Sequence, residues 1–231
     1  MASGVRDFAR ELCPPLVWRG LSRLRGRLRP QNGKASPDGQ DLAVYWDPEM
    51  AQILETWGEG NAWSEIQLLM STHAGRVLDI ACGTGKTIDL LRRFPELEVH
   101  GCDISDMLIG KAIERGIPPD RLTVTDATAM SYPDGSFDWA YTIGSLEHFT
   151  EDGILKLLAE CRRVVRKSTF HMIPVARSGR DEGWIKTLQS YHNNSVAWWD
   201  KKCRAVYPNV QILDSSWSDR ISVGKWLICS P

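Results

Sequence analysis

Hydrophobic and polar positions along residues 75–231 form a pattern that predicts strands and helices in turn. Short apolar runs predict strands near 76–80, 98–102, 121–125, 137–143, 168–175, 208–213 and 221–229. Helical spacing predicts helices near 86–94, 106–114, 152–164 and 183–204. Strands that alternate with helices favour an α/β fold with a mostly parallel sheet covered on both faces. The connection 214–220 is too short for a crossover helix, so the last two strands are expected to form an antiparallel hairpin at the sheet edge.

Residues 41–72 are predicted to form a helical lid. Two helical segments there are parted by a glycine-rich turn at 57–61, and the segment is rich in aromatic residues. Large aromatic side chains are mostly core residues. The turn that begins at Trp57 is the place where a cover over a pocket is expected.

Residues 1–40 differ in composition from the rest of the chain. Apolar residues recur there at helical spacing among many arginines, which predicts a basic amphipathic helix; these residues are Val17, Leu21, Leu24 and Leu28. A polar, turn-rich linker follows at 31–40. Because a basic amphipathic helix can lie on an anionic membrane surface, residues 5–29 are a candidate for such a contact. A helix docked on its own domain and a disordered basic arm are the alternatives.

Composition narrows the class of protein. The 231 residues, 42% of them hydrophobic, are enough for one sizeable core, and the formal net charge of −1 gives no overall attraction to nucleic acid. The six cysteines form no CxxC pair and have no histidine at zinc spacing, so neither disulfides nor a metal site is expected. No apolar run approaches the roughly 18 residues that suggest a membrane span. These features predict a cytoplasmic protein, with peripheral attachment at the inner membrane if the basic segment binds lipid.

Acidic residues follow three of the predicted strands. Asp79 ends the first strand, Asp103 the second and Asp126 the third, and the segment 145–148 (Ser-Leu-Glu-His) follows the fourth. Ligands of open α/β sheets bind at the carboxyl ends of the strands, so these residues are expected to border one crevice. The turn 83–85 (Gly-Thr-Gly) lies at the same edge and lets a ligand approach the backbone.

The three acids suit an adenosine that bears an amino acid. Asp103, about 20 residues after the glycines, is at the spacing of an acid that holds the two ribose hydroxyls. Asp126 can accept a hydrogen bond from the adenine amine, and a carboxylate at Asp79 opposes a phosphate but suits an ammonium group. A phosphate-binding P-loop fails because Ile80 stands where glycine is required. Ile88 stands at the third glycine of a dinucleotide fingerprint, so NAD or FAD is a weaker alternative.

These motifs, in this order, resemble class I S-adenosylmethionine-dependent methyltransferases, and most of all the small-molecule branch called type 11. The resemblance covers about residues 75–175 and rests on the motifs at 77–85, 101–107, 126–127 and 137–148. It implies a Rossmann-like methyltransferase domain over residues 41–231, with a seven-stranded, mostly parallel sheet, a C-terminal antiparallel hairpin and an N-terminal helical extension. It also implies S-adenosylmethionine as the cofactor.

The resemblance assigns a role to each matching residue. The cofactor-binding residues that it implies are Asp79, Ala81, Gly83, Thr84, Gly85, Asp103, Ile104, Met107, Asp126, Ala127 and Ser145. Asp79 and the glycine turn would hold the amino-acid end of the cofactor, and Asp103 the ribose. Ile104 and Met107 would face the adenine, and Asp126 with Ala127 would bind its amine. Ala81 departs from the family, which usually has glycine there.

A weaker likeness relates the rest of the chain to methyltransferases of bacterial surface-polysaccharide assembly. It rests on the basic N-terminal segment, on the turn 55–60 and on the motifs at 192–195, 198–199 and 214–217. It implies O-methylation of a sugar in a surface polysaccharide or glycolipid. A small-molecule methyltransferase of a natural-product pathway and a non-catalytic S-adenosylmethionine-binding accessory protein are the alternatives.

Methyl transfer to a hydroxyl calls for a general base. The candidates are His148, Glu147, His171 and His192, of which His148 and His192 are the predicted catalytic residues. His171 lies within the fifth strand, where alternation can turn it toward a helix layer. His192 belongs to an acceptor-side insertion, 176–206, whose aromatic, amide and charged side chains suit a sugar. The predicted acceptor-binding residues are Trp57, Arg180, Trp184 and Asn193.

Overall fold

The computed structural model of the chain describes residues 42–231, and the predictions for residues 1–40 lie outside this range. The helices are η2 (Leu42–Trp46), α2 (Pro48–Leu54), α3 (Ala62–Met70), α4 (Lys86–Leu91), α5 (Asp106–Glu114), η3 (Pro119–Arg121), η4 (Leu146–His148), α6 (Glu151–Val164) and α7 (Val196–Arg204). The strands are β1 (Gly75–Ile80), β2 (Leu97–Asp103), β3 (Leu122–Val124), β4 (Phe137–Ile143), β5 (Val165–Ala176), β6 (Trp184–Ile185), β7 (Tyr191–His192), β8 (Asn209–Ser218) and β9 (Ser222–Ser230). Within 42–231, no helix has the length and apolar character needed to cross a membrane.

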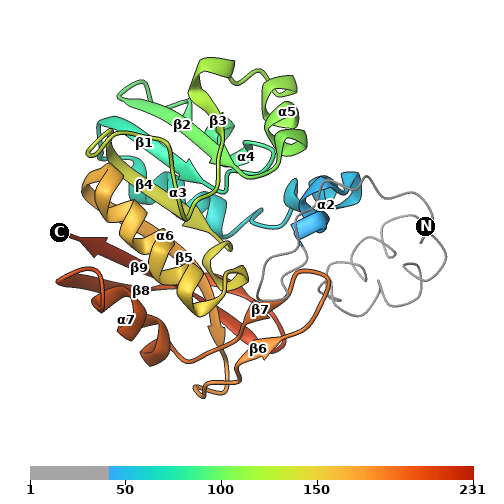
Figure 1. Ribbon diagram of the computed structural model, residues 1–231, viewed down its shortest axis with the longest axis vertical. Helices are drawn as coiled ribbons and strands as arrows, with labels where there is room; N and C mark the ends of the chain where they lie inside the picture. The colour runs from blue at the N-terminus through green and yellow to red at the C-terminus, as the bar shows by residue number, and fades with distance from the viewer. Residues whose placement is uncertain (1–41) are drawn as a thin grey trace.

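Seven strands form one sheet in the order β3-β2-β1-β4-β5-β9-β8 (Figure 1). Neighbouring strands from β3 to β5 are parallel, whereas β9 pairs antiparallel with both β5 and β8. The predicted seven-stranded, mostly parallel sheet with a C-terminal antiparallel hairpin is therefore confirmed. The hairpin forms because only a short turn separates β8 from β9, and a parallel pair would need a crossover connection.

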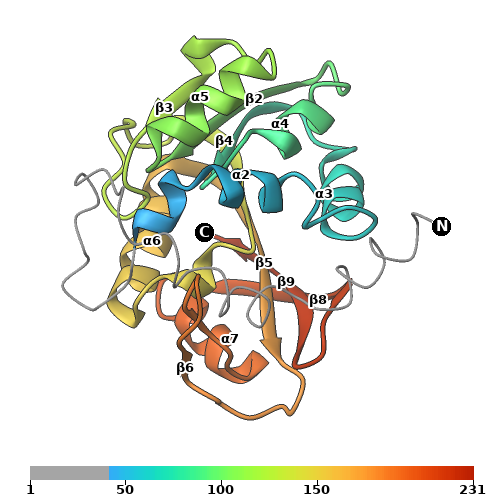
Figure 2. The same cartoon turned by 90° about the vertical axis from the view of Figure 1, so that its right-hand side faces the viewer.

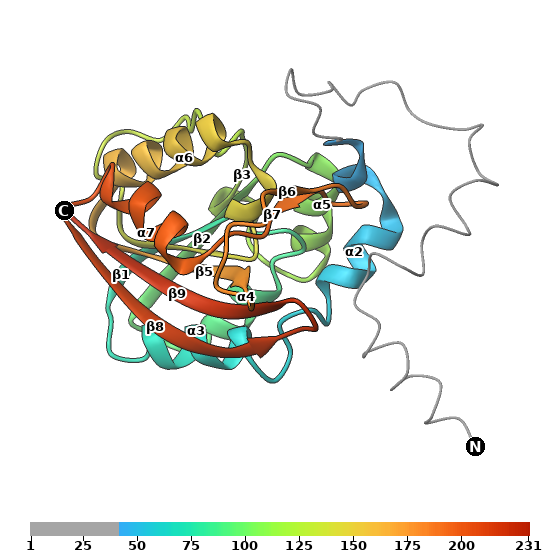
Figure 3. The same cartoon turned by 90° about the horizontal axis from the view of Figure 1, so that it is seen from below.

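Side chains of the sheet point alternately into two cores. Leu78 and Ile80 of β1 belong to the core beneath α6 and α7, whereas Val77 belongs to the core beneath α3, α4 and α5. Helix α6 contributes one apolar face at helical spacing, made of Ile154, Leu157, Leu158, Cys161 and Val164. Figure 3 shows α6 and α7 on one side of the sheet and α3 on the other. The central strands are thus buried on both faces, as parallel strands usually are.

The helix predicted over 183–204 is wrong in its first part. Residues 184–185 and 191–192 form the small hairpin β6–β7, and only Val196–Arg204 is helical. The Asn194 side chain accepts a hydrogen bond from the Gly183 amide at 2.7 Å, and the Asn193 amide donates to Glu182 at 2.6 Å. Asparagine side chains that bond to nearby backbone groups favour a loop over a helix. The helix begins only where Ser195 accepts a hydrogen bond from the Trp198 amide at 3.2 Å.

Segments far apart in the sequence cover the carboxyl ends of the strands. In Figure 1, α2 and the β6–β7 hairpin lie on the same side of the sheet, and Figure 2 looks onto that side with α2 in front of the strands. Helix α3 is attached to the last hairpin through Glu65. This carboxylate accepts hydrogen bonds from the Ser215 hydroxyl and from the Trp226 indole, both at 2.7 Å. The helical segment before β1 is therefore bonded to the opposite end of the chain.

Ala81, directly after β1, is strained. Its φ of 59° is the only positive φ at a non-glycine position among residues 42–231. A left-handed conformation costs a residue with a Cβ about 1–2 kcal/mol. The glycines that follow in the same turn, Gly83 and Gly85, have φ of 54° and 72° without this cost.

Replacing Ala81 with glycine is expected to raise the free energy of unfolding by about 0.5–1 kcal/mol, since the relief of strain exceeds the entropy cost of glycine. Urea and thermal unfolding measure this change. The matched control is Ala159→Gly, because Ala159 is exposed within α6. That variant is expected to lose about 1 kcal/mol. Equal losses in both variants would contradict strain at Ala81.

Candidate functional site

The glycine turn is held to the end of β2 by Asp103. Its carboxylate accepts a hydrogen bond from the Gly83 amide at 2.9 Å and another from the Ser105 amide at 2.9 Å. Asp103 is buried, and burial raises its pKa above the usual value. A Cβ at Gly83 would lie 3.1 Å from a methyl group of Leu54, so the turn also fits closely under α2. Asp103 thus joins the two predicted cofactor-binding motifs of β1 and β2.

A cavity lies above this turn, and we call it the turn cavity. It is lined by Leu54, Trp57, Trp63, Asp79, Ala81, Cys82, Gly83, Thr84, Lys86, Thr87 and Ile143. The Asp79 carboxyl group is buried there and accepts a hydrogen bond from the Thr87 hydroxyl. Burial raises the pKa of Asp79 to about 7, because its charged form has lost water without gaining a cation. The turn cavity therefore offers a carboxyl group that a cationic ligand would ionise.

The other predicted cofactor residues lie further along the strand ends. Ile104 and Met107 are half-buried around the start of α5, and Ala127 is buried in the core after β3. Asp126 is exposed, and its carboxylate accepts hydrogen bonds from the Thr128 amide and hydroxyl, both at 2.8 Å. The Ser145 hydroxyl donates to the Ile143 carbonyl at 3.3 Å. None of these side chains lines the turn cavity, although all lie at the predicted edge of the sheet.

Helix η2 covers the start of α5. The Ser105 hydroxyl donates to the Tyr45 carbonyl at 2.6 Å, and the Trp46 indole donates to the Asp106 carboxylate at 2.7 Å. Gln189, from the turn between β6 and β7, donates to the Tyr45 hydroxyl at 3.4 Å. The segment before α2 is thus in contact with both the cofactor-side strand ends and the β6–β7 turn.

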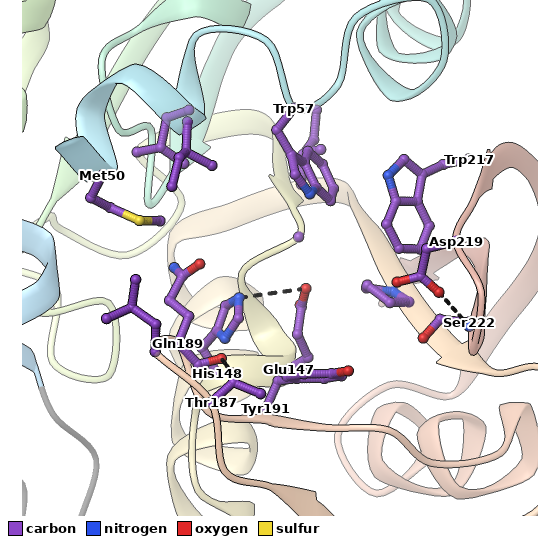
Figure 4. Close-up of a pocket in the computed structure, with 16 residues that line it drawn as sticks. Met50, Trp57, Glu147, His148, Thr187, Gln189, Tyr191, Trp217, Asp219 and Ser222 are labelled. Atoms are coloured by element: carbon purple, nitrogen blue, oxygen red, sulfur yellow. Dashed lines mark hydrogen bonds and ion pairs between the residues drawn. The ribbon is translucent and has the colours of Figure 1, made fainter. Parts of the chain in front are cut away.

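A second, larger cavity lies beside the turn cavity, and we call it the main cavity (Figure 4). Its volume is about 140 Å³, against about 60 Å³ for the turn cavity. It is lined by Met50, Ile53, Leu54, Trp57, Ile143, Gly144, Glu147, His148, Pro174, Thr187, Leu188, Gln189, Tyr191, Trp217, Asp219 and Ser222. Its walls are largely apolar and aromatic, and three residues, Leu54, Trp57 and Ile143, line both cavities.

Trp57 lies at the junction of the two cavities. A Cβ on Gly144, which has a φ of 62°, would come within 2.6 Å of the Trp57 ring. On its other side the Trp57 ring packs against Trp217, with the ring centroids 5.5 Å apart. The end of α2 is held in turn by Arg115, which forms an ion pair with Glu55 and donates to the Thr84 carbonyl at 2.9 Å. The position of Trp57 therefore depends on a bare glycine below it.

Glu147 and His148 lie side by side in the main cavity. The His148 Nδ1 atom donates to the Ser190 carbonyl at 3.0 Å, and its Nε2 atom lies 3.7 Å from Glu147 Oε1. Burial lowers the pKa of His148 to about 4, so its ring is neutral near pH 7. Burial raises the pKa of Glu147 to about 8. Glu147 therefore holds its proton near pH 7 more strongly than His148 does.

The two other histidine candidates lie away from both cavities. His171 is buried within β5, where it makes hydrogen bonds with the Thr142 and Thr169 hydroxyls at 2.9 and 3.0 Å, and burial lowers its pKa to about 3. His192 is buried between the rings of Trp184 and Trp198, at centroid distances of 4.7 and 5.1 Å. Neither histidine lines a cavity, so the position of His192 does not support the prediction that it is a base.

The predicted acceptor residues of the insertion do not reach the main cavity either. Arg180 is exposed in the loop after β5, and Trp184 packs on His192. Asn193 is buried behind the cavity wall, where it accepts a hydrogen bond from the Ser222 hydroxyl at 3.2 Å. Of the four predicted acceptor residues, Trp57 alone is among the lining residues that residues 42–231 provide.

Sequence reasoning missed much of the wall that closes the main cavity. The cavity-lining residues Thr187, Leu188 and Gln189 fall within the helix predicted over 183–204. Asp219 and Ser222 also line the cavity, but the sequence predicts only that they belong to the last hairpin and predicts no binding role for them. A glycine-bounded loop with two adjacent asparagines, at 193–194, was the available sign that 183–195 is not helical. No comparable sign placed the hairpin turn opposite Glu147.

A protein-family model described as a methyltransferase domain matches residues 77–168. The match runs from β1 into β5 and includes Asp79, the glycine turn, Asp103 and Glu147. Residues 77–168 are therefore similar to a methyltransferase domain. The domain has the class I architecture that the sequence motifs resembled, with the central strands ordered β3-β2-β1-β4-β5.

Two curated relatives each match a little under half of this chain. The chain is 30% identical over 115 residues to a demethylmenaquinone methyltransferase of Thermotoga maritima. This match covers 48% of this chain and 49% of the relative. It is 29% identical over 113 residues to the 27-O-demethylrifamycin SV methyltransferase of Amycolatopsis mediterranei. This match covers 46% of this chain and 41% of the relative. The chain thus spans about half the length of these relatives or less. The likeness to polysaccharide methyltransferases has no support in them and remains a prediction.

A solved structure agrees with the fold of the domain. The 1,6-didemethyltoxoflavin-N1-methyltransferase of Burkholderia thailandensis, with bound 1,6-didemethyltoxoflavin and S-adenosylhomocysteine, aligns with a TM-score of 0.63 at 16% identity. The alignment covers 82% of this chain and 85% of that chain. The Rossmann-like methyltransferase fold is therefore confirmed beyond the residues that the family model matches.

Replacing Gly144 with alanine is expected to displace the Trp57 ring and to lower the free energy of unfolding by about 1–3 kcal/mol, because the new methyl group overlaps the ring and the backbone has a positive φ. Thermal unfolding and tryptophan fluorescence measure both effects. The control is Gly110→Ala in α5, where a Cβ meets nothing within 4 Å. That variant is expected to gain up to about 1 kcal/mol from helix propensity. An unchanged fluorescence spectrum in Gly144→Ala would contradict the contact.

Proposed function

We propose that this protein transfers the methyl group of S-adenosylmethionine to a hydroxyl oxygen of a small, largely apolar acceptor. The observation that carries the proposal is the pair of adjoining cavities, one beside the glycine turn and Asp79 and one lined by aromatic rings and Glu147. Their shared wall of Leu54, Trp57 and Ile143 is where a donor and an acceptor could meet. Holding both reactants in one place is the main contribution of the protein to such a transfer.

The residues of the turn cavity fit the cofactor. Asp79 is a buried carboxyl group with a raised pKa, and an ammonium group is the ligand that would stabilise its charged form. Gly83 and Gly85 leave the backbone of the turn accessible, and Asp103 retains oxygen lone pairs for ribose hydroxyls beside its two amide contacts. Asp126, with Ile104 and Met107, is proposed for the adenine. The bound cofactor would supply an electrophilic methyl group, and the chain would supply binding and alignment.

The main cavity favours a neutral hydroxyl acceptor. No lysine or arginine is among the residues of 42–231 that line it, and its acidic side chains are Glu147 and Asp219. An anionic acceptor, such as a carboxylate or a phosphate, would meet these acids without a compensating cation. The aromatic walls formed by Trp57, Tyr191 and Trp217 suit a flat or apolar body. One relative is named as an enzyme that methylates an oxygen of a natural product, which agrees with this class of acceptor.

A sugar of a surface polysaccharide is a less favoured acceptor. The side chains proposed to bind it, Arg180, Trp184 and Asn193, lie outside the main cavity. The amphipathic segment at residues 5–29, which would bring the protein to a membrane, lies outside the described part of the chain. Among residues 42–231, no group of three or more His, Cys, Asp or Glu side chains is placed to hold a metal ion.

The affinity for S-adenosylmethionine is expected to depend on the protonation of Asp79. Because the pKa of Asp79 in the free protein is raised to about 7, an ammonium ligand must displace its proton below that pH. Affinity should therefore fall by about tenfold per pH unit as the pH drops from about 7 toward 5, with proton release on binding. Titration calorimetry in two buffers of different ionisation enthalpy measures both quantities.

Asp79→Asn is expected to bind weakly and without this pH dependence, and Asp103→Ala is expected to abolish binding. Asp152→Asn, which changes an exposed carboxylate on α6, is the control and should bind as the wild type does. An Asp103→Ala variant with unchanged affinity would refute the assignment of the cofactor.

The acceptor class is tested with methyl-labelled S-adenosylmethionine and a panel of phenols, aliphatic alcohols, carboxylic acids and lipid-linked glycans. Phenols or alcohols are expected to accept the label at oxygen, identified by mass spectrometry, and carboxylic acids are not. Removal of residues 1–34 is expected to leave this transfer unchanged, whereas it should reduce transfer to a membrane-bound glycan. Binding of the cofactor without any transfer would favour the accessory-protein alternative.

A further inference from the structure

Glu147 is a buried carboxyl group without a complete set of partners. It is 3% exposed, lies in η4 and lines the main cavity (Figure 4). Its Oε2 atom has no hydrogen-bond partner among residues 42–231. A buried carboxyl oxygen of this kind costs free energy unless a ligand satisfies it. Glu147 therefore combines an unsatisfied carboxyl oxygen with a place in the wall of the main cavity.

The groups around Glu147 in the main cavity include no cationic side chain among residues 42–231. From η4 itself, the neutral His148 ring lies 3.7 Å from Oε1. From other elements, the Tyr45 hydroxyl of η2 interacts electrostatically with Glu147, and the titratable side chains of Tyr191 in β7 and of Asp219 line the same cavity. Asp219 accepts hydrogen bonds from the Ile221 and Ser222 amides at 2.9 and 2.6 Å. Neither lysine nor arginine lines the cavity among the described residues, so nothing there offsets the loss of water that raises the pKa of Glu147 to about 8.

The position of η4 brings Glu147 close to the junction of the cavities. The helix follows β4 after a single turn, and Ile143, the last residue of β4, lines both cavities. Gly144 and Glu147 then line the main cavity below the Trp57 ring. A hydroxyl that reaches the junction would meet the Glu147 carboxyl group on this side.

We propose that Glu147 is the general base that takes the proton of the acceptor hydroxyl, and that His148 is a positioning residue that holds it. This inference rests on the proposed methyl transfer to oxygen. It replaces the prediction that His148 is the base. A group with a pKa near the working pH is the more effective proton acceptor, and His148, with a pKa of about 4, is a weak one. The bond from His148 Nδ1 to the Ser190 carbonyl fixes the ring beside Glu147.

The proton balance of the step is complete within the site. The acceptor O–H bond breaks as the new O–CH₃ bond forms, and the proton passes to the ionised Glu147 carboxylate. The sulfonium of the bound cofactor supplies the methyl group and retains the electron pair of the broken S–CH₃ bond, which leaves a neutral thioether. Glu147 must then release its proton to water before the next turnover. Because Glu147 is protonated below its pKa, the rate should rise with pH and level off above about 8.

The experiment compares Glu147→Gln, Glu147→Asp and His148→Asn with the wild type, using labelled S-adenosylmethionine and the best phenol of the panel. Glu147→Gln is expected to lower kcat by about 10²-fold or more, with little change in KM, and to abolish the rise of rate with pH. Glu147→Asp should recover part of the rate because it keeps a carboxylate. His148→Asn should lose less than about tenfold and keep the rise with pH. Asp152→Asn, an exposed carboxyl group nearby in sequence, is the matched control and should behave as the wild type does.

Infrared spectroscopy gives a readout that does not depend on turnover. The wild type should show a protonated-carboxyl C=O component that disappears as the pH rises through about 8, and this component should be missing from Glu147→Gln. The component of Asp79, which titrates near pH 7, should remain in both proteins and in Asp152→Asn. A Glu147→Gln variant with wild-type kcat and pH profile, or a larger loss in His148→Asn than in Glu147→Gln, would overturn the role of Glu147. So would the absence of the infrared band. Failure of the wild type to methylate any hydroxyl would overturn the proposed function, and this inference with it.

Discussion

The burial of carboxyl groups at the ends of parallel strands is the constraint on which this site depends. Asp79 lies near the end of β1, and Glu147 lies in η4, shortly after β4. The loss of water raises the pKa of both carboxyl groups. In the free protein this desolvation disfavours their charged forms, so these residues cost stability above their unfolded pKa values. This cost is explained if each carboxyl group serves a ligand: Asp79 would bind a cation, and Glu147 would accept a hydroxyl proton.

The covering segments make this desolvation possible. Helix α2 lies over the glycine turn, and Trp57 extends the cover to the end of β4. The turn between β6 and β7 closes the other side, where Gln189 reaches Tyr45 of η2. A site closed in this way excludes water, which strengthens electrostatic interactions within it. The same exclusion of water raises the pKa of Glu147 and lowers that of His148.

The two halves of the site differ in how they are encoded. The cofactor half is assembled from neighbouring strand-helix units, so that Asp79, the glycine turn and Asp103 come together through the parallel pairing of β1 and β2. The main cavity, which is proposed to hold the acceptor, is assembled from α2, η4, the β6–β7 turn and the β8–β9 hairpin. A domain matched by many methyltransferases can therefore keep one donor site while its acceptor site varies in the connecting segments.

The sequence by itself determined the order of the strands and helices, the sheet type and the acids at the strand ends. These features depend on periodicity and on short motifs, which are local in the sequence. Parallel pairing then places the carboxyl ends of the strands at one edge of the sheet. Only the tertiary structure decided that Trp217 packs on Trp57, that His192 lies between two indoles and that Glu147 has a raised pKa. Burial and ring contacts depend on residues up to about 160 positions apart in the chain, and no local pattern encodes them. The error over 183–195 has a more local cause, because the bonds of Asn193 and Asn194 to Glu182 and Gly183 favour a loop over the helical spacing.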